Sequence, residues 1–244
     1  LHGQVSESTA QDSASTETIR LADYAHQAID YLALGHVHQY QEGSLDGRGS
    51  WCYPGCLEGR GFDECTQHGF VLLDVDEATH QLRRQLVDIR QRHLWAVPLE
   101  VQGLDSSMAI VRRARALLSL LSGTPSADPA IAEITAERVE AILQAGAGVR
   151  MRAQDLVKLE LRGALAMDVE LSLDFIRTQL EPMFYYLRVV DETRRFIDPS
   201  MYQHDKSLKG AFVHSVEADA TLDEQTKAAV IEAGLRLLRG EELL

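Results

Sequence analysis

Two histidines in the segment "YLALGHVHQ" have a spacing suited to metal binding. His36 and His38 follow a short apolar run and Gly35, and a single residue separates them. Side chains alternate with period two along an extended chain, so both imidazoles are expected on the same side of a rigid strand end. Neutral imidazole is the commonest nitrogen ligand of divalent transition metals. The spacing suits a metal centre, but a lone His-x-His pattern is more often a pair of ordinary polar histidines, so the neighbouring motifs have to decide.

A second candidate metal pattern is C-x3-C-x8-C-x2-H, formed by Cys52, Cys56, Cys65 and His68. Structural zinc sites use such ligands, but this spacing fits no common zinc ribbon, so we expect buried or partly buried thiols instead. Three cysteines do not make a disulfide framework, and a reducing cytoplasm fits them best. The histidines outside these patterns have no ligand-like spacing and are expected at surface or structural positions: His26, His80, His93, His204 and His214.

Short strands are expected to position these residues in the first third of the chain. Apolar runs predict strands at 30–35 and 50–55, the second ending in a Pro-Gly turn. Two further strands around the turn "DEAT" predict a hairpin. Residues 6–18 are expected to form a surface loop and residues 19–29 a short helix.

The pattern changes after about residue 95. Helical spacing occurs over 106–122, 129–146 and 168–181, and strands are predicted at 155–163 and 183–191. The order strand, helices, strand, helix, strand predicts a small α+β domain from about 95 to 192. The tail from 199 is polar at first and then predicts an amphipathic helix over 222–239, ended by Gly240.

Several of these motifs resemble a known superfamily. "DYLALGHVHQ" resembles the last metal motif of the calcineurin-like metallophosphoesterases, and "LHGQ" at residues 1–4 resembles an earlier motif that supplies another ligand. "YPGCLEGRGFDE" followed by "HGFVLLDVD" is more specific and resembles the SbcD-type DNA double-strand-break repair exonucleases. The resemblance is close over residues 1 to about 90. It is looser over 95–192, where "LVKLELRG" and "FYYLRVVDET" resemble the capping domain of that family.

The resemblance implies roles for individual residues. His2 and His36 would bind one divalent metal ion and His38 a second, and the ions of this family are usually manganese. They would polarise a backbone phosphodiester and hold a hydroxide for in-line attack. Tyr53 and Gly55 would shape the wall beside the site, with Gly55 letting backbone come close.

The resemblance also implies an α+β chain in three parts. Residues 1–92 would be the end of a four-layer α/β/β/α metallophosphoesterase sandwich, 93–195 a small α+β capping domain and 196–244 a helical tail. The full protein would be a manganese-dependent exo- and endonuclease that acts on DNA ends, works with an SbcC-type coiled-coil ATPase and could form a homodimer. The helix at 222–239 is then either a packing helix or a segment that docks on the ATPase.

The earlier motifs of the superfamily, Asp-x-His, Gly-Asp-x-x-Asp and Gly-Asn-His, do not occur in this sequence. The first residue is Leu1 rather than Met, so we expect the chain to be a piece of something longer and those motifs to lie upstream. Three histidines alone cannot hold two ions in catalytic geometry. We therefore expect this chain to be inactive as a nuclease by itself.

The charge of the chain limits how it could hold DNA. The formal net charge is -13, which argues against binding nucleic acid by bulk electrostatics alone but leaves room for metal ions and a local basic patch. Arg48 and Arg60 lie in loops near the histidine motif and are expected to contact DNA. Other arginine clusters are more often solvated: Arg83 and Arg84, Arg90 and Arg92, and Arg112, Arg113 and Arg115. No apolar run approaches the length of a membrane span, so we expect no membrane partner.

Two other functions stay open. The same chemistry could act on a nucleotide or another small phosphoester, although the cap-like segment at 95–192 argues for DNA. The chain could instead be a non-catalytic subunit that binds DNA or the ATPase. A long upstream reading frame carrying Asp-x-His would exclude this last alternative.

Overall fold

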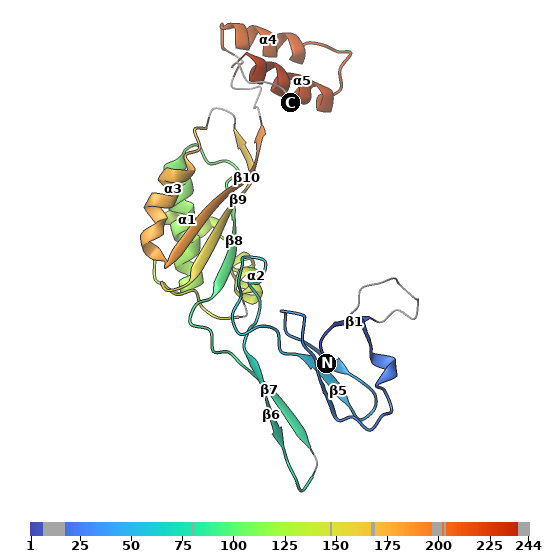
Figure 1. The fold of residues 1–244 in the computed structure, drawn as a ribbon. Coiled ribbons are helices and arrows are strands. Elements are labelled where there is room, and N and C mark those ends of the chain that lie inside the picture. The colour runs from blue at the N-terminus through green and yellow to red at the C-terminus, as the bar shows by residue number, and fades with distance from the viewer. Residues whose placement is uncertain are drawn as a thin grey trace.

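A computed structural model of the chain describes residues 1–6, 18–79, 81–146, 148–166, 169–196, 202 and 204–238. Within these ranges the chain is a mixed α/β structure with several small sheets and five α-helices (Figure 1). This confirms the α+β class in its coarse form. None of the helices in these ranges is long and apolar enough to cross a membrane.

The first part of the chain forms a small sheet from short strands. Strand β5 (Ser50–Tyr53) lies between β3 (Tyr31–Ala33), with which it is parallel, and β4 (Gln41–Ser44), with which it is antiparallel. A parallel pair, β1 (Gln4–Ser6) and β2 (Thr18–Arg20), lies next to β3. Among the described residues, the buried apolar cluster of this region is small: Ile19, Leu32, Leu34, Leu45 and Tyr53.

The predicted helix at 19–29 is wrong. Residues 18–20 belong to β2, and only Leu21–Asp23 form a short 3-10 helix, η1. His26 and Ala28 have φ angles of 62° and 59°, in the left-handed region that a right-handed helix cannot continue through. Ile19 is buried in the parallel pairing with β1, so its tertiary contacts decide the local structure. Most of the predicted surface loop, residues 7–17, lies outside the described residues.

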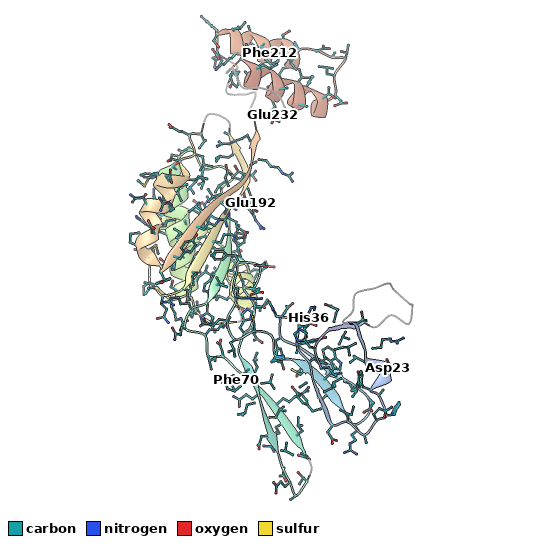
Figure 2. All side chains as sticks on the ribbon, viewed as in Figure 1. Asp23, His36, Phe70, Glu192, Phe212 and Glu232 are labelled. Atoms are coloured by element: carbon teal, nitrogen blue, oxygen red, sulfur yellow. The ribbon has the colours of Figure 1, made fainter. Side chains whose placement is uncertain are left out.

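The predicted hairpin is confirmed. Strands β6 (Phe70–Val75) and β7 (Leu82–Val87) pair in antiparallel register and form a two-stranded ribbon that extends away from the neighbouring sheets (Figure 1). Phe70 lies at its base (Figure 2). Large apolar side chains of β6 are exposed: Phe70, Leu72, Leu73 and Val75.

The second part of the chain contains the larger core. Three parallel strands, in the order β10-β9-β8, form one sheet, and α1 and α3 cover one of its faces (Figure 1). Trp95, Val157 and Leu159 belong to one buried apolar cluster that also contains Ile110 of α1 and Ile176 of α3. The elements are β8 (Leu94–Glu100), α1 (Ser107–Ser122), η2 (Pro129–Glu133), α2 (Ala136–Ala145), β9 (Leu156–Ala166), α3 (Leu173–Leu180), η3 (Glu181–Met183) and β10 (Tyr186–Phe196). The predicted order of strands and helices is confirmed.

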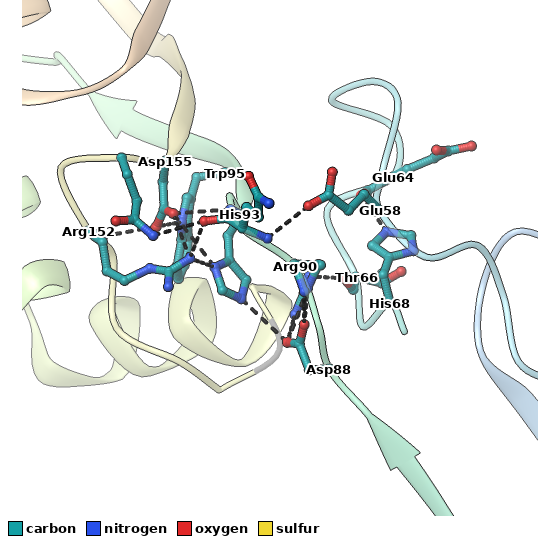
Figure 3. A network of polar contacts seen from close by, with 12 residues as sticks. Glu58, Glu64, Thr66, His68, Asp88, Arg90, His93, Trp95, Arg152 and Asp155 are labelled. Atoms are coloured by element: carbon teal, nitrogen blue, oxygen red, sulfur yellow. Dashed lines mark hydrogen bonds and ion pairs between the residues drawn. The ribbon is translucent and has the colours of Figure 1, made fainter. Parts of the chain in front are cut away.

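A buried carboxylate connects the start of β8 to the start of β9. Asp155 is fully buried and accepts hydrogen bonds from the His93 backbone N–H (3.0 Å), the Trp95 indole N–H (3.1 Å) and the Arg152 backbone N–H (2.9 Å) (Figure 3). Burial raises the pKa of Asp155, but hydrogen bonding, from the His93 side chain first and then from these three N–H groups, outweighs it and holds the pKa below its usual range. His93 is also buried, which agrees with the structural role expected for it.

The C-terminal segment contains two packed helices. Helix α5 (Glu224–Leu237) confirms most of the predicted helix over 222–239, and it packs on α4 (Leu208–Glu217) through Val213, Ile231 and Leu235. Helix α4 was not predicted, because the sequence analysis described the start of the tail, from residue 199, as polar. The expected helix end at Gly240 lies outside the described residues.

Candidate metal centre

His2 and His36 come together through a parallel backbone contact. The backbone N–H of Gly3 donates to the Gly35 carbonyl (3.0 Å), and the Gly35 N–H donates to the Leu1 carbonyl (2.8 Å). The two imidazole rings then meet edge to face, with centroids 5.3 Å apart. A Cβ on Gly35 would lie 3.0 Å from Nδ1 of His2, so the small residue allows this approach. The structure therefore joins the two histidines that were expected to share an ion.

The backbone at His36 differs from the extended segment that the spacing predicted. Strand β3 ends at Ala33, and His36 has φ 106°, in a region that non-glycine residues rarely adopt. The prediction that His36 and His38 lie on the same side of one extended strand end is therefore wrong. Strained backbone of this kind is concentrated at functional sites, where surrounding structure enforces it.

His38 contacts a different set of residues. Its Nδ1 lies 2.6 Å from Oε1 of Glu64, and Nη2 of Arg60 lies 2.9 Å from each ring nitrogen. The Arg60 backbone N–H also donates to Oε2 of Glu64 (2.8 Å). The Arg60 N–H and the His38 ring lower the pKa of Glu64 by hydrogen bonding. A carboxylate, an imidazole and a guanidinium thus form one half-exposed cluster.

The Tyr53–Pro54–Gly55 turn supports both histidine segments. Tyr53 is 1% exposed, and its hydroxyl donates to the Gly3 carbonyl (2.5 Å) and accepts from the Val5 N–H (2.9 Å). Its hydroxyl is therefore bonded to the segment that carries His2 and does not face a substrate. Gly55 has φ 79°, and a Cβ there would lie 2.6 Å from the His38 carbonyl, so the close backbone approach expected at this glycine is present.

The two arginines expected to contact DNA lie in different places. Arg60 lies against His38. Arg48 forms a two-pronged ion pair with Asp30, at the opposite end of β3 from His36, with distances of 2.5 and 2.9 Å. The structure therefore brings Arg60 but not Arg48 to the histidines. The other clusters mostly pair with acidic groups or backbone, as in Arg90 with Asp88, Arg112 with Asp128, Arg113 with Glu133 and Arg115 with the Gln179 carbonyl.

The cysteines do not assemble the alternative zinc set. Cys52 is buried, Cys56 and Cys65 are partly buried, and all three thiols are free, as expected. Among the described residues, one group of three has ligand atoms within 4.8 Å of one another: His38, Cys56 and Glu64. The Cys56 sulfur lies 3.3 Å from Nδ1 of His68 and donates to the Glu58 carbonyl (3.2 Å).

The loop at 56–68, which carries Glu64, is tied to the segment leading into β8 and to β10. The Thr66 carbonyl accepts from Nη1 of Arg90 (2.8 Å), and Glu58 accepts from the Gln91 N–H (2.8 Å) (Figure 3). Phe62 stacks on Tyr186 of β10, with ring centroids 6.4 Å apart. Glu64 was given no role from the sequence, although its place in the motif "YPGCLEGRGFDE" was the available signal.

A cleft of about 420 Å³ begins at Gln39, the residue after His38. Its lining comes from the segment after His38, the 56–68 loop and the end of α2: Gln39, Tyr40, Thr66, Gln67, Gln144, Ala145 and Gly148. This volume is in the range of small-ligand sites in proteins.

Imidazole nitrogens are good ligands of divalent transition metals, and the structure places them in two groups: His2 with His36, and His38 with Glu64 and Cys56. In comparisons with known proteins, no family model matches this chain and no curated protein matches it.

Proposed function

We propose that this chain contributes part of the metal centre of a metal-dependent DNA repair nuclease of the SbcD type, in the calcineurin-like metallophosphoesterase superfamily. The observation that carries the proposal is the contact between His2 and His36, whose rings lie 5.3 Å apart although they come from separate segments. Metal ligands need this convergence, and an incidental pair of polar histidines does not. The positive φ angle of His36 adds support, because strained backbone persists only where the surrounding structure enforces it, and such positions cluster at functional sites.

Each residue of the site has a role under this proposal. His2 and His36 hold one divalent ion, and His38 holds a second, both manganese as the resemblance implies. When bound, the ions polarise a DNA phosphodiester and supply a hydroxide for attack. Arg60, exposed beside His38, donates to the phosphate and helps to orient it. Tyr53 and Gly55 hold the histidine segments in place.

The proposal extends to the finer fold and to the partners. Residues 1–92 form the end of a four-layer metallophosphoesterase sandwich, and the β8–β9–β10 sheet with α1, α2 and α3 forms a DNA-contacting capping domain. Helices α4 and α5 form the segment that reaches an SbcC-type ATPase in the cytoplasm. The stacking of Phe62 on Tyr186 of β10 supports it, since this contact connects the loop that carries Glu64 to the capping domain.

The test uses the complete gene expressed from its native start. We expect manganese-dependent degradation of linear duplex DNA, and its loss in His36→Ala, with Arg48→Ala as a surface control that keeps activity. Chelation of metal should abolish cleavage, and added manganese should restore it. Absence of cleavage by a folded wild-type protein would refute the nuclease proposal.

A small phosphoester is the second candidate substrate, and the size of the cleft next to the His38 segment, about 420 Å³, favours it. The two candidates separate in a competition assay on the complete protein with a chromogenic phosphodiester. Strong inhibition of its hydrolysis by short duplex DNA supports the nuclease. Turnover that DNA does not affect supports the small-substrate enzyme.

A further inference from the structure

Glu64 and His38 form the shortest side-chain contact of the candidate centre. Oε1 of Glu64 lies 2.6 Å from Nδ1 of His38, and Glu64 is mostly buried, with a side chain 18% exposed. The second carboxylate oxygen accepts from the Arg60 backbone N–H at 2.8 Å. Both oxygens therefore have a donor, which fixes the carboxylate in one orientation.

The donors and acceptors around His38 define its tautomer. A carboxylate only accepts hydrogen bonds, so Nδ1 of His38 must carry the proton that points to Glu64. Nη2 of Arg60 lies 2.9 Å from both ring nitrogens and therefore does not distinguish them, whereas the carboxylate lies against Nδ1 alone. With the proton on Nδ1, the free lone pair of a neutral imidazole is on Nε2. That lone pair is the one that a metal ion would use.

The position of Glu64 depends on the loop that carries it. Residues 56–68 are attached by the Arg90 bond to the Thr66 carbonyl, by the Gln91 bond to Glu58 and by the stacking of Phe62 on Tyr186. The carboxylate therefore does not depend on His38 for its position. It is placed to orient the imidazole.

We propose that Glu64 is a positioning residue that holds His38 as the Nδ1–H tautomer and directs Nε2 to the metal. This inference rests on the proposed function, since it assigns His38 as a ligand. Carboxylates that accept from the second nitrogen of a ligating histidine are a general feature of metal sites, and their loss costs about 10–100-fold in metal affinity.

The first test reads the tautomer without metal or activity. Imidazole ¹⁵N NMR of the 244-residue chain in alkaline buffer should show His38 as the Nδ1–H form, which is the less common one for a free imidazole. Glu64→Ala should shift it towards the Nε2–H form, and Glu64→Gln should retain much of the original form because its amide oxygen still accepts. A wild-type His38 in the Nε2–H form would overturn the inference.

The second test measures manganese affinity of the complete protein by calorimetry. We expect about a 10–100-fold loss in Glu64→Ala, a smaller loss in Glu64→Gln, and no change in Asp63→Asn, a matched charge removal at an exposed position of the same loop. Wild-type binding with unchanged affinity in Glu64→Ala would overturn the positioning role alone. No manganese binding by the folded wild type would instead refute the proposed function.

A third measurement separates positioning from direct ligation. Glu64 and Cys56 lie close enough to His38 to form a three-ligand site of their own. Titration with cobalt should give no sulfur-to-metal charge-transfer absorption if Glu64 only orients His38. Such a band, present in the wild type and lost in Cys56→Ser, would overturn the inference in favour of that direct site.

Discussion

The region that carries the histidines and the region after residue 92 are stabilised in different ways. Among the described residues, the first has a cluster of five buried apolar side chains, whereas the second has a cluster of twenty-one. The first region instead holds its site by backbone contacts, a buried tyrosine hydroxyl and ion pairs. The difference indicates that the second region is a stable scaffold and that the site depends on specific polar geometry.

The two tryptophans allow each region to be followed separately. Trp51 lies in β5 of the first region, and Trp95 lies in β8 of the second. Single-tryptophan variants would therefore report unfolding of one region at a time. Urea unfolding of such variants should show the second region unfolding at the higher urea concentration.

The largest effect is expected in the core of the second region. Leu159 is fully buried in the middle of β9, and truncation to alanine removes contacts on the side facing α1 and α3. We expect a loss of about 2–5 kcal/mol in the free energy of unfolding, read from Trp95 fluorescence in urea. The exposed Leu72→Ala should change it by less than about 0.5 kcal/mol. Equal effects of the two variants would contradict the scaffold interpretation.

The next effect concerns Asp155 and acid. The pKa of Asp155 is lower in the folded state than in the unfolded state, so its ionised form stabilises the fold. This contribution is fully present above the unfolded-state pKa, and it is lost as the pH falls through the folded-state pKa. Asp88, whose pKa is lowered to about 2 by its hydrogen bonds with Arg90, acts in the same direction. We expect wild-type stability to fall as the pH drops below the ordinary carboxyl value of 3.8.

Asp155→Asn isolates this contribution. It should cost about 1.5–3 kcal/mol at neutral pH, because hydrogen bonds to a charged acceptor become neutral ones. Its melting temperature should also depend less on pH in the acid range. Glu77→Gln, at an exposed turn, is the matched control and should leave both quantities unchanged. If the melting temperature of Asp155→Asn depends on acidic pH as strongly as that of the wild type, other carboxyl groups cause that dependence.

Gly55 is the clearest test of the first region. Its φ of 79° and the 2.6 Å approach to the His38 carbonyl leave no room for a methyl group. Gly55→Ala should cost about 1–3 kcal/mol, and it should reduce manganese binding by displacing His38. Gly47→Ala is the control, since a Cβ there meets nothing within 4 Å. An unchanged manganese affinity in a folded Gly55→Ala variant would show that metal binding does not depend on the conformation of this turn.

The second region could be predicted well from sequence because its strands and helices have long, regular patterns. The alternation in "LVKLELRG" and the helical spacing over 106–122 reproduce the observed β9 and α1. The hairpin β6–β7 could also be predicted, since its turn lies between two apolar strands. These patterns predict the structure because each element either buries one face in a core or pairs in regular register with a neighbouring strand.

The site itself could be predicted only in part. The meeting of His2 and His36 followed from motif resemblance, but the left-handed backbone at His36 and the partner Glu64 did not. Both depend on contacts between segments distant in sequence, which local periodicity does not report. The predicted helix at 19–29 failed for the same reason, because Ile19 pairs with β1.

The smallest effect is expected at Tyr53, and it bears on how the first region holds His2. Tyr53→Phe removes the hydrogen bonds to the Gly3 carbonyl and the Val5 N–H but keeps the ring in its packing. We expect a loss of about 0.5–1.5 kcal/mol in the free energy of unfolding, read from Trp51 fluorescence. The Trp95 signal should not change, because the two clusters are separate. Tyr24→Phe serves as control, and a matching loss there would show that hydroxyl removal alone, rather than the anchoring of the His2 segment, weakens this region.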